Sequence, residues 1–134
     1  MVSSKFNENE LIEQAKLAMK NAYAPYSGVK VGAALLDKSG HIFQGCNIEN
    51  ASYGLTICAE RTAIGCAITS GSHDFTAIAI VNSTEKTFSP CGACCQVLAE
   101  FSDRMKVIMV SQKGKVVRSD IKSLFPDAFK LDPK

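Results

Sequence analysis

Residues 76–82, Thr-Ala-Ile-Ala-Ile-Val-Asn, form a continuous apolar run that is rich in β-branched side chains. A run of this length with no alternating polar residues is typical of a strand that is buried on both faces of a sheet. Both faces of such a strand must be covered, and helices usually provide the cover. The run therefore predicts a central strand of a layered α/β fold.

Helical and strand patterns flank this run on both sides. From Glu8 to Asn21, apolar residues recur every three or four positions, as in an amphipathic helix. Two more helices are expected, from about Cys58 to Ser70 and from about Cys91 to Phe101. The other predicted elements are strands at 29–37, 41–46, 106–111 and 116–118, an irregular loop at 47–57, and a short helix at 120–125 that Pro126 ends.

The order of these elements predicts how the strands pair. The turn residues 38–40 join strands 29–37 and 41–46 into an antiparallel hairpin. Strands that are joined through helical crossovers pair in parallel, which we expect for the second half of the sheet. The predicted fold is a three-layer α/β/α sandwich with a mixed five-stranded sheet, and residues 1–134 are expected to form a single domain.

The charge and composition limit the class of ligand. The chain has 134 residues, 46% of them hydrophobic, and a formal charge of +2 from 15 basic and 13 acidic side chains. This balance supplies little of the positive surface that a long phosphate backbone requires. We therefore expect a small neutral or zwitterionic ligand and no nucleic-acid partner.

Location is predicted from what the sequence lacks. Residues 1–6 do not contain the apolar run of a signal peptide, and nowhere do about 18 apolar residues stand together as a membrane span requires. We expect a cytoplasmic protein without membrane contact. Six cysteines in such a chain favour reduced thiols, and their spacing points to a metal.

Two short motifs carry the chemistry, Cys58-Ala59-Glu60 and Pro90-Cys91-Gly92-Ala93-Cys94. Three thiolates can hold Zn²⁺ and leave its fourth tetrahedral position for water, while a nearby carboxylate moves protons. Cys58 and Cys91 each stand where a loop becomes a helix, where the helix dipole lowers thiolate pKa values. Cys94 follows one helical turn after Cys91, so both sulfurs face the same side. These features favour an open, hydrolytic zinc site.

Two alternatives remain for these cysteines. They could be buried structural residues, or Cys95 could complete a closed zinc site with four thiolates, although Glu60 would then have no role. Three thiolates on Zn²⁺ carry a net charge of about −1, which Arg61 is placed to offset. Of the remaining polar candidates, Cys46 and Cys66 are expected in the core, and His41 and His73 in solvent.

The motifs occur in an order that resembles the small cytidine deaminase family, the homotetrameric type with three zinc cysteines. The resemblance covers nearly the whole chain. The matching segments are Pro25-Tyr26-Ser27, Val31-Gly32-Ala33-Ala34-Leu35, Asn47-Ile48-Glu49-Asn50-Ala51-Ser52-Tyr53, Cys58-Ala59-Glu60-Arg61, Ser89-Pro90-Cys91-Gly92-Ala93-Cys94 and Leu124-Phe125-Pro126-Asp127-Ala128-Phe129.

This resemblance implies a cytidine deaminase-like fold and a role for each matching residue. Cys58, Cys91 and Cys94 would hold one Zn²⁺ per subunit, and Glu60 would shuttle protons while hydroxide generated at the zinc attacks C4 of cytosine. The implied reaction is the hydrolytic deamination of cytidine and deoxycytidine to uridine and deoxyuridine, with release of ammonia, in pyrimidine salvage.

The resemblance also implies the substrate-binding residues. Asn47 and Glu49 match the pair that bonds the ribose hydroxyls, although both residue types also commonly cap loops. Ala59 is assigned to the substrate pocket, and Phe129 matches a phenylalanine that stacks on the pyrimidine from a neighbouring subunit. Tyr53 matches an interface tyrosine. The implied assembly is a homotetramer whose active sites are shared between subunits.

Two positions depart from the family pattern. Val29 stands where the family usually has phenylalanine, which affects base stacking, and Cys95 stands where arginine is common. The nearest rival activity is deamination of another cytosine-bearing compound, such as blasticidin S, or of cytosine within a polynucleotide. A zinc-stabilised binding module with four thiolates is the rival outside enzymes.

Overall fold

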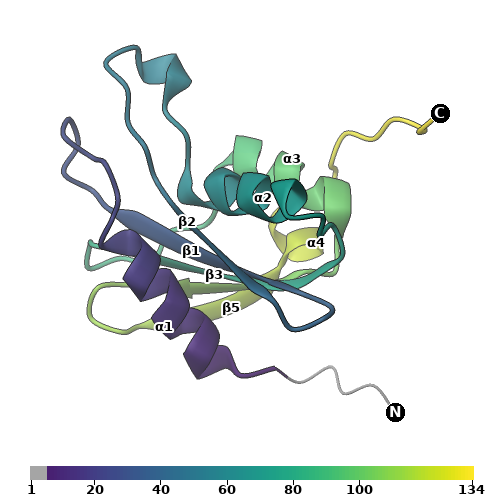
Figure 1. The fold of residues 1–134 in the computed structure, drawn as a ribbon, viewed down its shortest axis with the longest axis horizontal. Helices are drawn as coiled ribbons and strands as arrows, with labels where there is room; N and C mark the ends of the chain where they lie inside the picture. The colour runs from purple at the N-terminus through teal and green to yellow at the C-terminus, as the bar shows by residue number, and fades with distance from the viewer. Residues whose placement is uncertain (1–5) are drawn as a thin grey trace.

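The computed structural model describes residues 6–134, which form one five-stranded sheet with helices on both faces (Figure 1). The helices are α1 (Glu8–Met19), α2 (Ala59–Thr69), α3 (Gly92–Phe101) and α4 (Ile121–Leu124), with a short 3₁₀ helix η1 (Tyr53–Leu55). The strands are β1 (Val31–Asp37), β2 (Ile42–Cys46), β3 (Phe75–Asn82), β4 (Lys106–Val110) and β5 (Val116–Asp120), in the spatial order β2-β1-β3-β4-β5.

The central strand β3 explains why the chain folds in three layers. Ile78 and Ile80 face one apolar cluster, whereas Ala77, Ala79 and Val81 face another. The first cluster is completed by α2, α3 and α4, and the second by α1, so helices lie above and below the sheet in Figure 1. The apolar run at 76–82 thus predicted a doubly covered strand, and the three-layer sandwich with a mixed sheet is confirmed.

Strand pairing follows the prediction in part. β1 and β2 form the antiparallel hairpin, and β3 pairs with β4 in parallel after the α3 crossover. The expected parallel pairing does not extend to the last strand of the sheet, because β5 lies antiparallel to β4. The connection from β4 to β5 is a short turn in which Gly114 has a φ of 87°, and such a turn reverses the chain.

Gly45 in β2 determines how closely α2 approaches the sheet. A Cβ atom at this position would collide with the carbonyl oxygen of Ala59 and the amide nitrogen of Ala63. The side chains of Ala59 and Ala63 are themselves fully buried in this contact. The small residues let the first turn of α2 lie directly on β2, which fixes where Cys58 begins the helix.

The remaining sequence expectations have mixed outcomes. His41 and His73 are exposed as predicted. The core assignment of Cys66 is wrong, because this residue lies on the exposed side of α2, and Cys46 is only half-buried.

Across residues 6–134, no helix combines the length and apolar character that crossing a membrane requires. Residues 1–5, which the signal-peptide argument used, lie outside the described residues.

Candidate metal centre

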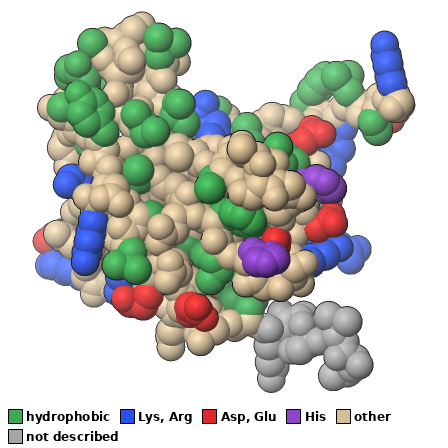
Figure 2. Space-filling view, viewed as in Figure 1, with side chains coloured by type: hydrophobic (Ala, Val, Ile, Leu, Met, Phe, Trp, Pro, Cys, Tyr) green, Lys and Arg blue, Asp and Glu red, His purple; other side chains and the backbone are tan. Residues whose placement is uncertain are grey.

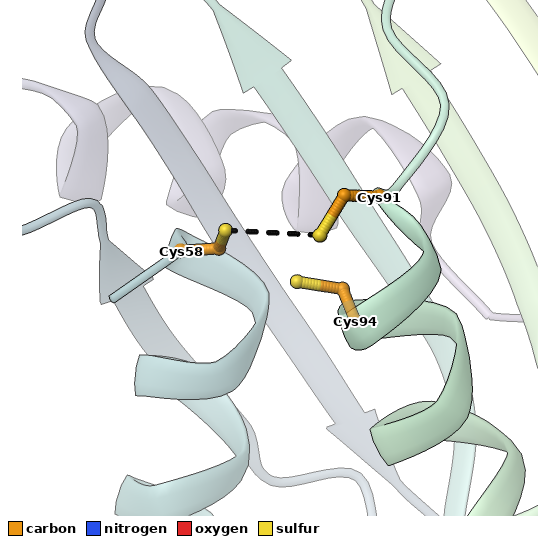
Figure 3. A group of neighbouring side chains, drawn as sticks. All are labelled: Cys58, Cys91 and Cys94. Atoms are coloured by element: carbon orange, nitrogen blue, oxygen red, sulfur yellow. Dashed lines mark hydrogen bonds between the residues drawn. The ribbon is translucent and has the colours of Figure 1, made fainter. Parts of the chain in front are cut away.

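The sulfurs of Cys58, Cys91 and Cys94 lie together between the starts of α2 and α3 (Figure 3). All three sulfur atoms are within 4.8 Å of one another, and the Sγ atoms of Cys58 and Cys91 are 4.0 Å apart. Two sulfurs bound to the same tetrahedral zinc at about 2.3 Å stand roughly 3.8 Å apart. The cluster therefore needs little adjustment to hold Zn²⁺.

The two helix starts explain why these thiols suit a metal. Cys58 is the N-cap of α2 and Cys91 the N-cap of α3, and neither helix has a side-chain hydrogen bond at its cap. The unpaired backbone N–H groups and the positive end of each helix dipole therefore stabilise negative charge on the nearby sulfurs. Cys94 lies in the first turn of α3 and is fully buried.

Cys95 is not part of the sulfur cluster. Its side chain is buried and its Sγ donates to the backbone oxygen of Pro90 at 3.5 Å, while burial raises the pKa of its thiol. Within residues 6–134, the three clustered cysteines are the one group of His, Cys, Asp or Glu side chains with the geometry of a metal site. Three sulfur donors fit zinc and leave one coordination position free for water or substrate. The described residues therefore provide no fourth sulfur ligand, as a closed four-thiolate site would require.

Arg61 supplies the positive charge that the cluster needs. Its guanidinium Nη2 donates to the Cys58 sulfur at 3.5 Å. A hydrogen bond from the Cys94 thiol is the main cause that lowers the pKa of Cys58 to about 5, and Arg61 adds to this shift. The same contact, together with burial, raises the pKa of Cys94. Metal-bound cysteines are thiolates, so binding of a divalent cation releases the remaining thiol protons.

Glu60 is a buried carboxyl group beside the sulfur cluster. Its exposed fraction is 6%, and it lies in the first turn of α2, directly between Ala59 and Arg61. Burial raises the pKa of Glu60, and the negative charge of the Cys58 sulfur raises it further. A carboxyl group with a raised pKa holds a proton more readily than an ordinary carboxylate, which suits a group that accepts and passes on protons.

Asn47 and Glu49 lie on the loop after β2 and brace the loop that precedes β1. The Asn47 amide accepts from the backbone N–H of Val31 at 2.8 Å and donates to the backbone oxygen of Val29 at 2.9 Å. The Glu49 carboxylate accepts from the backbone N–H groups of Tyr26 and Ser27 and from the Ser27 hydroxyl. Both side chains are therefore loop braces, and their contact with ribose stays a prediction.

These hydrogen bonds also set the charge of Glu49. The bond from the Ser27 hydroxyl is the main cause that lowers the pKa of Glu49, with the two backbone bonds adding to it. The group is thus held as a carboxylate, which is an acceptor only. An ionised acceptor in a fixed orientation is suited to hydroxyl donors.

The other predicted pocket residues are placed differently. Ala59 is fully buried at the first position of α2, next to the sulfur cluster. Phe129 and Tyr53 are 68% and 67% exposed, Phe129 on the C-terminal tail and Tyr53 in η1. Val29, at the position where stacking was in question, is half-buried. The structure thus unites the three cysteines, Glu60 and Arg61, but leaves the two aromatic side chains in solvent.

Two residues of this region were not singled out by the sequence. Ser27 donates to Glu49, and the Gln96 side chain bonds both backbone groups of Phe129. Ser27 stands in the quoted Pro-Tyr-Ser motif, which offered a signal. No local pattern joins Gln96 to a residue 33 positions later.

Comparison with known proteins agrees with this geometry. The family profile described as the cytidine and deoxycytidylate deaminase zinc-binding region matches residues 6–111. A cytidine deaminase from Sporosarcina psychrophila is 48% identical over 121 residues, which cover 90% of this chain and 89% of that protein. The crystal structure of a cytidine deaminase from Burkholderia pseudomallei superposes with a TM-score of 0.89 at 47% identity, covering 92% of this chain and 100% of the other.

The fold and the sulfur cluster define a zinc deaminase, and the chain belongs to the cytidine and deoxycytidylate deaminase family. A more distant relative shows how far the similarity extends. A blasticidin-S deaminase from Bacillus cereus is 33% identical over 104 residues, which cover 72% of this chain and 74% of that protein.

Proposed function

We propose that this protein is a cytidine deaminase that converts cytidine and deoxycytidine to uridine and deoxyuridine with release of ammonia. The observation that carries the proposal is the cluster of three sulfurs with the buried carboxyl of Glu60 beside it. The high identity to cytidine deaminases over nine-tenths of the chain supports the choice of nucleoside.

The roles of the site residues follow from their chemistry. Cys58, Cys91 and Cys94 hold Zn²⁺, which when bound lowers the pKa of a water molecule and so supplies hydroxide at neutral pH. Glu60 accepts a proton from the attacking water and delivers it to N3 of cytosine. It then takes the proton of the new C4 hydroxyl and passes it to the amine, so that the C4–N bond breaks, ammonia leaves and the C4 carbonyl of uridine forms. Arg61 neutralises part of the negative charge of the sulfurs.

Recognition of the sugar is assigned to the braced loop after β2. Glu49 is an oriented carboxylate and Asn47 is a buried amide, and each keeps hydrogen-bonding capacity beyond the backbone bonds described above. We propose that these groups bond the ribose hydroxyls. The formal charge of +2 supports a free nucleoside over a polynucleotide.

Assembly into a homotetramer with shared active sites is part of the proposal. The loop that carries η1 protrudes at the upper left of Figure 1, and hydrophobic side chains are exposed in the same region of Figure 2. Contiguous exposed apolar surface marks a protein interface more often than a free surface. The exposed apolar residues of this loop, here called the η1 patch, are Ile48, Tyr53, Leu55 and Ile57.

Phe129 is the second residue on which the proposed assembly depends. Phe129 is exposed on the tail and would complete the base-binding side of a neighbouring subunit's site. Ala59 would line the same pocket at the start of α2.

We assign the enzyme to the cytoplasm, because a site made of three thiols requires the cysteines to stay reduced.

Blasticidin S is the second candidate substrate. Val29 is half-buried and smaller than the usual phenylalanine, so it would leave more room on one side of the base. One relative of this chain is a blasticidin-S deaminase. A larger cytosine-bearing compound could use this space.

An ammonia-release assay with zinc-loaded protein tests the proposal. The substrates would be cytidine, deoxycytidine, cytosine, adenosine and blasticidin S at equal concentration. We expect kcat/KM for the two cytosine nucleosides to exceed the others by at least tenfold. Preference for blasticidin S would establish the second candidate, and no ammonia from any cytosine compound would refute both.

A further inference from the structure

The side chain of Gln96 forms two hydrogen bonds to the backbone of one distant residue, Phe129. Its Nε2 donates to the Phe129 backbone oxygen at 2.8 Å, and its Oε1 accepts from the Phe129 backbone N–H at 3.2 Å. One amide thus satisfies both polar backbone groups of a residue 33 positions away. This pair of bonds is called the Gln96 clasp below.

The clasp acts on a segment with little other support. Residues 125–134 contain no helix or strand, although Phe125 and Ala128 still pack against the core. The next side chain, Phe129, is 68% exposed. In Figure 1 the C-terminal tail leaves the body of the molecule beyond α3 and α4. The clasp therefore fixes the backbone at the point where the tail presents an aromatic ring to solvent.

The direction of the clasp follows from helix geometry. Successive helical residues are rotated by about 100°, so Gln96 is about 160° away from Cys94 around the axis of α3. Cys94 is buried toward the sulfur cluster, whereas Gln96 is half-buried on the other side. The clasp thus holds Phe129 on the side of α3 that faces away from the cluster of its own chain. A second copy of the chain is the natural recipient of the ring.

We propose that Gln96 is a positioning residue that orders Phe129 for contact with the pyrimidine in a neighbouring subunit. This inference rests on the proposed function, since it takes the cytosine ring as the group that Phe129 meets. A tail that is ordered before binding loses less conformational entropy when the substrate binds, so the clasp strengthens substrate binding. The side-chain hydrogen bonds of Gln96 go to the Phe129 backbone, so its effect on substrate binding is proposed to act through Phe129.

The test replaces Gln96 by methionine, which has a similar length but cannot form the two bonds. We expect KM for cytidine to rise about threefold to tenfold while kcat changes by less than about twofold. Zinc content and the sedimentation coefficient should match those of the wild type. Gln44→Met is the matched control, because Gln44 is an exposed glutamine whose side chain bonds Gln14, far from the tail.

A double-mutant cycle separates positioning from a general structural effect. In the Phe129→Ala background, Gln96→Met should cause no further rise in KM, because the ring that it orders is gone. Hydrogen exchange of the Phe129 amide should be faster in Gln96→Met than in the wild type. A KM increase of equal size in both backgrounds, or an unchanged amide exchange rate, would overturn the proposal.

The design also keeps the two proposals distinct. If Gln96→Met fails to fold, Gln96→Asn serves instead, because it stays polar but is too short by one methylene to span both bonds. An active wild type with an unchanged KM in the variant overturns the positioning role alone. A wild type that releases no ammonia from cytidine overturns the proposed function, and the inference with it.

Discussion

The sulfur cluster and the aromatic segments of this protein are held in different ways. The cluster is built on the first turns of α2 and α3, two helices that pack on the sheet through fully buried side chains. Phe129 and the η1 patch lie instead on a tail and a loop, where their side chains are exposed. The three thiols and Glu60 thus have rigid support within one chain. Phe129 and the η1 patch have no covering surface within the described residues.

This difference separates the chemistry from part of the recognition. The three thiols, Glu60 and Arg61 come together without any second chain. The exposed aromatic side chains are stabilised only when they pack against another surface. We therefore expect changes in the cluster to lower kcat, and changes in the exposed segments to affect assembly and KM.

The largest effect should come from Glu60→Gln. The amide keeps the shape of the side chain but cannot transfer protons, so kcat should fall by roughly 10²–10⁴-fold. Zinc content should stay near one per chain, because Glu60 is outside the sulfur cluster. Metal analysis and ammonia release measure the two quantities separately. Near wild-type turnover in this variant would show that Glu60 is not the proton shuttle. The expectation that changes beside the cluster lower kcat would then lose its main support.

The next largest effect should come from a charge in the η1 patch. Tyr53→Asp places a carboxylate on a surface that is proposed to be buried between subunits, so the tetramer should dissociate. We expect kcat/KM to fall at least about tenfold while zinc stays bound, because the cluster is complete in one chain. Sedimentation and metal analysis report the two halves of this result. Asn50→Asp, an exposed polar position on the same loop, is the matched control. A fully active monomer would show that no neighbouring subunit is needed.

The sequence was sufficient to predict the fold because its patterns are local. The run at 76–82 gave the central strand, and the helical periodicity gave α1, α2 and α3 to within about two residues. Pairing of β5 was less accessible, because it depends on the tight turn at Gly114 and not on hydrophobic periodicity. The exposure of Cys66 was missed for a related reason, since cysteine composition says little about which side of a helix a residue occupies.

The site was predictable where residues are close in sequence and less so where they are not. The spacing of Cys91 and Cys94, and of Cys58 and Glu60, predicted neighbours that the structure brings together with the rest of the cluster. The side chains of Asn47 and Glu49 bond backbone groups of a different loop, so the spacing of residues in the sequence does not predict these bonds. The Gln96 clasp depends on where the tail crosses α3, which only the folded chain determines.

A smaller effect, on stability, tests the support of the cluster. Gly45→Ala would force β2 and α2 apart, since the new Cβ meets backbone atoms of Ala59 and Ala63. We expect the free energy of unfolding to fall by about 1–3 kcal/mol, and zinc affinity to fall as the start of α2 shifts. Thermal unfolding and a zinc-chelator competition measure the two changes.

Gly65→Ala provides the matched control for this substitution. Gly65 lies in the same helix α2, but a Cβ there meets nothing within 4 Å. Replacing a helical glycine by alanine in open space should raise stability by about 0.5–1 kcal/mol. Equal effects of the two substitutions would mean that the contact between β2 and α2 does not support the cluster.

The smallest effect is expected at the opposite end of α2, where Asp37 is buried at the end of β1. Burial raises the pKa of its carboxyl, but the hydrogen bonds from Ser72 and His41 outweigh this and hold the pKa below its usual value. A carboxyl with a lowered folded-state pKa stabilises the protein above its unfolded-state pKa of about 3.9, and this contribution is lost as the pH falls through the folded-state value.

Ser72→Ala isolates this contribution, because it removes the 2.7 Å bond from the Ser72 hydroxyl to the Asp37 carboxylate. The variant should be about 1 kcal/mol less stable at pH 7, and its Tm should approach that of the wild type as the pH falls from 5 to 3. Loss of zinc in acid affects both proteins and cancels in the difference. Kinetic constants should be unchanged, since α2 separates Ser72 from the sulfurs by roughly 16 Å along its axis. Parallel Tm curves would mean that Ser72 does not act through the charge of Asp37. A changed kcat would mean that this end of α2 does not act independently of the cluster.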